Sequence, residues 1–435
     1  MLKLGRGRAY VLVKDHYDPS LRDPILHACL HNLAYDRQLE GTRGWYMYTI
    51  IHATHDFAYY RDAVYSALLN LTSETEDYDI EHLYRLAANI AEDGDSEMRE
   101  AITQKFLSTP AFGDFVAAKE IVRLDGLDGF IYVAEFLSEK MREHGPDFIV
   151  GEDTYSADIG LLFALEDAIG EEEAKAAVEK LRLERPSITP ILDAIDVWRK
   201  RPKRRKKRER HLTYAEVKQG IEDPSPKSRW QYRGWAREAS DEELLQAAHD
   251  LLAETDPTRL IHYVGMFDKR PFPLDPAGLI ALAQHADWDV AIRAIGALEQ
   301  IEHPSVRAFA LESIERGNRV GRMVGLLQRG SNYQESDWAI IEPLTRQVND
   351  EDDYHSLGMA VRDIFEQHPT PLAIASLLNV FQNGPCGFCR EYLVDNLATL
   401  GAIPDWLREE AEYDSNSDVR EAVQKLGNLG ESGEE

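Results

Sequence analysis

Apolar residues recur at helical spacing along most of the chain. Segments such as "DAVYSALLNL" (62–71), "DEELLQAAHDLLAE" (241–254) and "IRAIGALEQI" (292–301) place them three and four positions apart. This spacing is typical of a helix that buries one face. Only "AYVLV" (9–13) and "DFIV" (147–150) look like strands. The pattern predicts an all-α chain of about twenty short helices with short loops, which fits helix-pair stacking.

A second pattern is an arginine that recurs near the start of predicted helices. An apolar residue precedes it, such as Met98 or Val419, and an acidic residue often stands before that, such as Asp95 or Asp418. We interpret each case as a helix N-terminus that buries one face and carries the arginine at its flank. The arginines in question are Arg61, Arg99, Arg293, Arg307, Arg362, Arg390 and Arg420.

Two of these segments resemble HEAT-like repeats of the short bacterial kind. They are "ADWDVAIRAIGALEQIEHPSVRAFALESIERG" (286–317) and "YDSNSDVREAVQKLG" (413–427). The resemblance is clearest over about 275–330 and 355–428. It implies an α-solenoid of stacked antiparallel helix pairs, in which each pair buries its apolar face against its neighbours. Such a solenoid leaves a long concave surface for an extended partner.

The organisation along the chain predicts two helical arrays. We expect an N-terminal array over 1–198 and a C-terminal HEAT-like array over 228–428. A basic linker and irregular segment, 199–227, would join them. The acidic, glycine-rich tail 429–435 should be frayed.

The charge balance restricts the kind of partner. The chain has 435 residues, with 49 basic against 77 acidic, for a formal net charge of −28. Residues 199–210 hold ten of the basic residues and one acidic residue, so the rest of the chain has 39 against 76, or −37. Such a surface repels phosphate backbones and favours basic partners. We expect no membrane partner, because no apolar run approaches the length of a bilayer span. With three cysteines and no targeting signal, the sequence predicts a soluble cytoplasmic protein. A nuclear location stays open for a eukaryotic source.

The basic run "RKRPKRRKKRER" (199–210) is the main candidate for nucleic-acid or anion binding. Lysine and arginine would contact phosphates, and nearby tryptophans would stack on bases. Two alternatives are a nuclear localisation signal and a linker that pairs with the protein's own acidic faces. The candidate residues are Arg199, Lys200, Arg201, Lys203, Arg204, Arg205, Lys206, Lys207, Arg208, Arg229, Trp230, Arg233 and Trp235.

Cysteine and histidine pairs offer weaker hypotheses. Cys386 and Cys389 stand three residues apart at a predicted helix start, which suits a redox pair or part of a zinc site. However, Cys389 aligns with Met98 and Val419, which favours a small buried apolar residue. A predicted pair of helices over 22–37 and 42–54 would bring histidines near each other and near a carboxylate, Asp56. These histidines are His27, His31, His52 and His55. We expect no metal or other cofactor.

No catalytic signature appears in the sequence. A GxGxxG after a strand, a GxxxxGK[ST] and a GxSxG are all missing. The sequence therefore predicts a non-enzymatic α-solenoid scaffold or adaptor that binds a protein or peptide along a largely acidic surface. The alternative is a nucleic-acid-binding solenoid that uses 199–210 and the Trp/Arg segment 229–237. Catalysis stays open, because some HEAT-like solenoids are DNA glycosylases.

Overall fold

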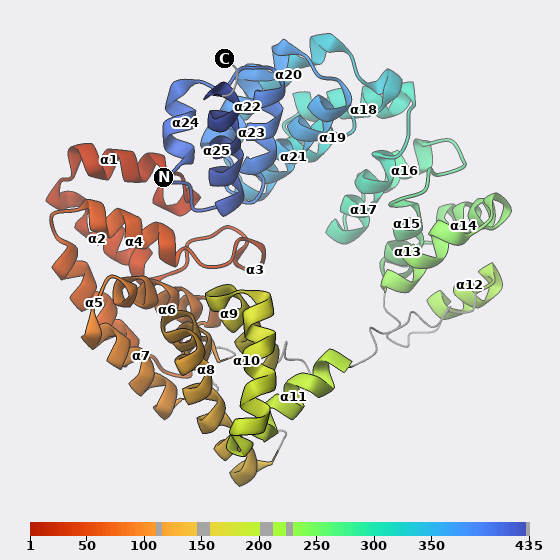
Figure 1. Cartoon of the computed structure of the whole chain (residues 1–435). Helices are drawn as coiled ribbons and strands as arrows, with labels where there is room; N and C mark the ends of the chain where they lie inside the picture. Colours follow the sequence, from red (N-terminus) through yellow and green to blue (C-terminus); the bar gives the residue numbers. More distant parts are fainter. Residues whose placement is uncertain (110–114, 146–156, 201–211, 223–228, 432–435) are drawn as a thin grey trace. The chain divides into compact units, whose positions relative to one another are not determined.

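The computed structural model describes residues 1–109, 115–145, 157–200, 212–222 and 229–431. These residues form twenty-five α-helices and short 3₁₀ turns, with no strand among them (Figure 1). The prediction of an all-α chain is therefore confirmed. No helix in these ranges is both long enough and apolar enough to cross a bilayer.

The strand expected over 9–13 is wrong, since these residues lie within helix α1 (Arg8–His16). Helix α1 packs on α4 (Gly44–Ala53), and this packing overrides the weak strand preference of the two valines, Val11 and Val13. The other strand-like segment, 147–150, lies outside the described residues.

The chain divides into two compact units. The first comprises 1–204, 386–388 and 404–435, and the second comprises 205–385 and 389–403. This grouping differs from the predicted arrays, because 404–435 belongs with the N-terminal helices. The C-terminal helices belong to the first unit because they contact its N-terminal residues. Arg6 donates to Glu410 at 2.7 Å, and the rings of Tyr10 and Tyr413 stack with their centroids 3.8 Å apart.

The first unit packs around helix α6, which contacts five other helices: α2, α4, α5, α7 and α8. Ten residues of α6 are buried, including His82, whose Nε2 donates to the carbonyl of Ala28 at 3.0 Å. Helix α8 changes direction at Gly126, whose φ of 56° suits glycine. The helices not yet bounded are α2 (Arg22–Leu30), α3 (Arg37–Glu40), α5 (Phe57–Leu69), α6 (Asp77–Glu92), α7 (Ser96–Ser108), α8 (Val116–His144), α9 (Ala157–Ile169), α10 (Glu171–Glu184), α11 (Thr189–Lys200), α24 (Asp405–Ala411) and α25 (Ser417–Glu431).

The second unit is a run of short helices in which each packs on near neighbours along the chain. Contacts join α15 to α17, α18 to α19, α19 to α21 and α21 to α23. Polar caps begin several of them: Ser240 and Glu243 form a capping box at α14, and Asp287 accepts from the Val290 amide at α17. The helices are α12 (Tyr214–Glu222), α13 (Arg229–Glu238), α14 (Asp241–Ala253), α15 (Pro257–Val264), α16 (Ala277–Leu282), α17 (Trp288–Leu298), α18 (Pro304–Glu315), α19 (Val320–Gly325), α20 (Trp338–Gln347), α21 (Glu351–Gln367), α22 (Ile374–Asn383) and α23 (Arg390–Thr399).

Arginine–aspartate pairs tie neighbouring helices of the first unit together. Arg61 of α5 donates to both oxygens of Asp95 at 2.6 and 2.8 Å, while Asp95 also caps α7 through the Met98 amide. Earlier in the chain, Arg22 donates to Asp56 at 2.8 Å. In each pair, the aspartate lies 34 residues after the arginine and directly precedes the first turn of a helix. Arg99 of α7 continues the series by pairing with Asp125.

The same pairing occurs in the second unit. Arg307 of α18 donates to both oxygens of Asp337 at 2.7 Å, and Asp337 directly precedes α20. The apolar residue before the arginine is fully buried in several segments, including Met98, Val306 and Val419. Arg390 differs, because only 1% of its surface is exposed, so the expectation that it stands at a helix flank is wrong.

Candidate functional site: a charged pocket on helix α17

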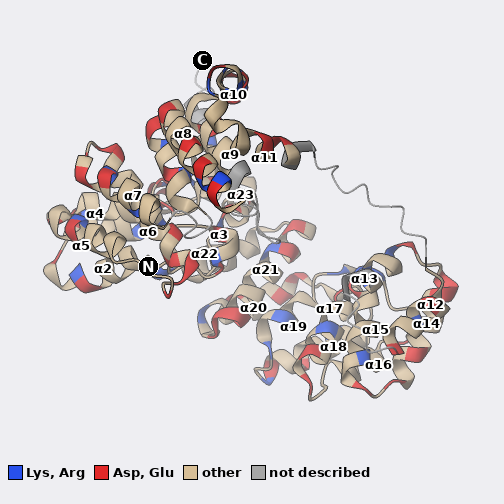
Figure 2. Cartoon of the chain, turned by 90° about the horizontal axis from the view of Figure 1, so that it is seen from below, with Lys and Arg blue, Asp and Glu red and all other residues tan. Residues whose placement is uncertain are grey.

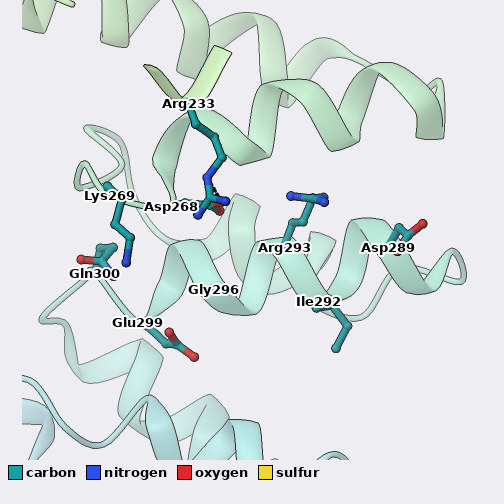
Figure 3. Close-up of a pocket in the computed structure, with 9 residues that line it drawn as sticks. All are labelled: Arg233, Asp268, Lys269, Asp289, Ile292, Arg293, Gly296, Glu299 and Gln300. Carbon is teal, nitrogen blue, oxygen red and sulfur yellow. Dashed lines mark ion pairs between the residues drawn. The ribbon is translucent and has the colours of Figure 1, made fainter. Parts of the chain in front are cut away.

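One face of α17 and the two residues after it line a pocket in the second unit (Figure 3). The opposite face of the helix is core, with Val290, Ala294 and Leu298 fully buried. The pocket face follows from the helical repeat, since its residues stand three or four positions apart. These residues are Asp289, Ile292, Arg293, Gly296, Glu299 and Gln300.

The remaining wall comes from two other elements. Arg233 reaches in from α13, and Asp268 and Lys269 follow the 3₁₀ turn Gly265–Phe267. Arg233 Nε and Asp268 Oδ2 form an ion pair of 2.8 Å, which is drawn in Figure 3. The pocket offers about 260 Å³ of water-accessible space, a volume that suits a small ligand or one side chain of a partner.

Arg293 has no carboxylate partner in the described part of the chain. Its Nε is buried and makes no hydrogen bond there. Lys269, which is exposed, likewise has no ion pair among the described residues. Both Arg293 and Lys269 lie near enough to Asp268 to lower the pKa of its carboxyl group. The pocket therefore combines two uncommitted cations in a protein of net charge −28. A buried donor without a partner is costly, and a bound acceptor relieves that cost.

Glu299 stands at the end of the pocket face. Its pKa is raised to about 7, mainly by burial and also by nearby Asp363, while Arg322 and Lys269 oppose the shift. Burial also raises the pKa of Asp268, against the pull of its cationic neighbours. Near neutral pH, Glu299 is therefore divided between its neutral and charged forms, and the cations of the pocket are only partly compensated.

Gly296 keeps the middle of the pocket open. A methyl group built on its Cα meets no atom within 4 Å. Glycine is a weak helix former, so its presence inside α17 is not explained by helix stability. Gly296 leaves open space between Arg293 and Glu299.

A second pocket, in the first unit, has the opposite character. It has about 340 Å³ of water-accessible space and lies along α8, with Thr103 of α7 on its rim. Arg99 already pairs with one of its carboxylates, Asp125, while Asp128 has no ion pair in the described ranges. Tyr132 adds an exposed ring beside Asp128. A carboxylate next to an aromatic face suits a cationic side chain.

The structure separates the predicted nucleic-acid residues. Residues 201–211 lie outside the described ranges, as do the side chains of Arg199, Lys200, Arg229 and Trp230. Arg233 lines the α17 pocket. Trp235 is only 6% exposed, and its Nε1 donates to the carbonyl of Leu212 at 2.7 Å. Trp235 is therefore a core residue that cannot stack on a base, which corrects that part of the hypothesis.

The four histidines contact different partners. The predicted helix over 22–37 ends at Leu30, and His31 beyond it contacts Asp79 at 2.8 Å. The rings of His27 and His31 are 4.6 Å apart, whereas His52 pairs with Asp93 at 3.3 Å. His55 lies edge-on to Tyr17, and Asp56 is taken by Arg22 and the Tyr17 hydroxyl.

The cysteines also differ from one another. Cys386 is buried and is grouped with the first unit. Helix α23 begins at Arg390, so Cys389 is its N-cap residue and Cys386 stands before the helix. Cys389 is half-buried rather than fully buried, and its Sγ lies 3.4 Å from Nε2 of His355 within the second unit.

Comparison with known proteins adds no relative. Neither a model of a known protein family nor a curated protein matches this sequence. Among solved structures, a crystal structure described only as an engineered protein matches 97% of this chain and 98% of its own, at 15% identity. The TM-score of that match is 0.19, a likeness too slight to assign a fold.

Proposed function

We propose that the chain is a non-enzymatic, HEAT-like α-solenoid that binds a protein or peptide partner of basic character. The observation that carries this proposal is the repeated arginine–aspartate pair. Arg61–Asp95 and Arg307–Asp337 make the same contact in different units, each from one helix to the start of another about 30 residues on. In both cases the contact joins a helix to the second helix after it, and a stack of helix repeats requires such a recurring contact.

The surface charge supports a basic partner. Exposed carboxylates occur on helices of both units; Asp62, Glu97, Glu172 and Asp241 are exposed although each also forms an ion pair. Figure 2 shows Asp and Glu in red along the helices of both units. A surface of this sign attracts cationic segments over several ångströms and raises their association rate.

The pocket on α8 provides a place for one cationic side chain. Asp128 supplies an uncommitted carboxylate, and the ring of Tyr132 can cover a lysine or arginine head group. A partner held there would keep its remaining charges along the acidic helix faces. The pocket therefore defines the position that matters most for the test.

The test uses an array of random peptides of equal length that differ in charge. The full chain should retain peptides enriched in lysine and arginine, and retention should fall with salt. Asp128→Asn combined with Tyr132→Ala should weaken the best peptide about tenfold, the order expected for loss of one ion pair and one cation–π contact. Glu172→Gln on α10 controls for the loss of one negative charge at an exposed carboxylate. Retention that is indifferent to peptide charge would contradict the proposal.

Nucleic-acid binding stays a prediction that depends on 199–210. DNA and RNA binding measured across a salt series, with residues 203–208 replaced by serine, tests it. If binding disappears with the replacement, residues 199–210 are the nucleic-acid-binding site.

A further inference from the structure

We propose that the α17 pocket binds a carboxylate group at the guanidinium of Arg293, while Lys269, near the other end of the same lining, adds positive charge to the pocket (Figure 3). This site stands on the geometry of the second unit alone and does not depend on the proposed partner. The two cations line one pocket, and neither forms an ion pair in the described ranges. A carboxylate would supply the acceptor that the buried Nε of Arg293 lacks.

Arg293 belongs to a motif that is otherwise satisfied by aspartate. Arg61 and Arg307 hold both oxygens of a carboxylate within their own units. Arg293 occupies the same place in its segment and has no such partner in the described chain. The fork of its guanidinium thus matches the group that its counterparts already bind, which is a planar carboxylate.

The acidic residues of the pocket favour a single negative charge over a double one. Asp268, Asp289 and Glu299 share the lining with the cations. Arg233 is engaged by Asp268 at 2.8 Å, so its charge is already compensated. A phosphate dianion would meet stronger repulsion from these groups than a carboxylate, because the repulsion scales with charge.

The shape of the pocket admits the rest of such a ligand. Gly296 leaves the floor open beside Arg293, and Ile292, which is half-buried, provides an apolar surface. Gln300 offers an amide at the far end. A short aliphatic acid, or the last residue of a peptide, would place its carboxylate at Arg293 and its apolar part against Ile292.

The experiment measures thermal stabilisation of the full chain by sodium propionate at constant ionic strength, with chloride as the balancing anion. Propionate should raise the unfolding temperature in a saturable manner. Arg293→Gln should weaken this response at least tenfold, while Arg316→Gln should leave it unchanged. Arg316 is a matched control, because it is an exposed arginine on α18 whose ion pair among the described residues is with Glu312 one turn away.

A second variant guards against a failure of Arg293→Gln to fold. Lys269→Gln changes an exposed side chain, so it should fold normally and weaken propionate several-fold. No saturable response in the unmodified chain, or equal responses in both pocket variants and the control, would overturn the proposal. Inorganic phosphate that binds more tightly than propionate through Arg293 would overturn the carboxylate assignment.

Two peptides distinguish the sources of the carboxylate. N-acetyl-trialanine carries a free C-terminal carboxylate, and its amide does not. Tighter binding of the acid than of propionate, lost in the amide, would support a chain terminus as the ligand. Equal binding of the acid and propionate would support a free small acid. An amide that binds as well as the acid would contradict the site.

Discussion

Arg293 and Arg307 stand in consecutive helices of the second unit and belong to the same sequence pattern, yet their surroundings differ. Both terminal nitrogens of Arg307 donate to the carboxylate of Asp337, and one of them also donates to the carbonyl of Asn332. Arg293 opens into a pocket and has a buried Nε without an acceptor in the described chain. One arginine therefore serves the fold, and the other is available for a ligand.

The difference arises outside the pattern itself. The residue that decides the role of Arg307 is Asp337, 30 positions downstream at the start of another helix. Asp268, whose pKa Arg293 lowers, is already engaged by Arg233. The sequence pattern around an arginine thus predicts its position near the start of a helix. Whether that arginine forms an internal ion pair depends on a carboxylate that is distant in the sequence.

The comparison is tested most strongly by truncating both arginines. Arg307→Ala should lower the free energy of unfolding of the second unit by about 3 kcal/mol, because it leaves Asp337 buried and unpaired. Arg293→Ala should change it by less than about 0.5 kcal/mol. Hydrogen exchange of the amides in α18 and α20 under increasing urea reports the unit directly. Equal losses in the two variants would show that Arg293 also serves the fold.

A smaller effect should follow from Glu299→Gln. The pKa of Glu299 is about 7 in the folded chain, above the ordinary glutamate value of 4.5. As pH rises between these values, the unfolded chain releases a proton that the folded chain keeps, so stability falls. The variant should match the unmodified chain near pH 4. By pH 8 it should exceed the unmodified chain by on the order of 2 kcal/mol. The check is the urea midpoint of the second unit across this range; parallel curves would contradict the burial of Glu299.

The smallest effect should come from Gly296→Ala. The new methyl group meets no neighbour, and alanine is the better helix former, so α17 should gain about 0.5–1 kcal/mol. The same methyl group narrows the pocket, so binding of propionate should weaken while stability increases. Gly234→Ala on α13, where a methyl group also meets no atom, controls for the helix effect alone. If propionate binding weakens equally in both variants, the effect of Gly296→Ala does not come from narrowing of the pocket.

Much of the fold could be predicted from the sequence because it depends on local patterns. Spacing of apolar residues predicted an all-α chain, and residues such as Met98 and Val306 are buried where the pattern placed them. The strand expected over 9–13 was wrong because two valines were weighed without the helix that covers them. The end of α2 at Leu30 was missed because the following residues continue the apolar spacing.

Only part of the candidate site could be predicted from the sequence. Arg233 was identified for its charge and Arg293 for its motif, and both line the pocket. Glu299 was not identified, since its burial depends on helices far along the chain. Trp235 was assigned to ligand binding because a tryptophan among arginines has the same sequence appearance whether it is exposed or in the core. A polar face with a central glycine in "DVAIRAIGALEQ" (289–300) was the available signal.

The contact between α1 and α24 has a consequence for synthesis. Glu410 and Tyr413 complete the packing around Arg6 and Tyr10, but the ribosome makes them about 400 residues later. The first unit must therefore wait, with its N-terminal helix partly uncovered, while the whole of 205–385 emerges. The second unit can fold as soon as it leaves the ribosome, and the first becomes complete only when the last helices appear. Release of a chain truncated before residue 404 should expose the surface of α1 to chaperones.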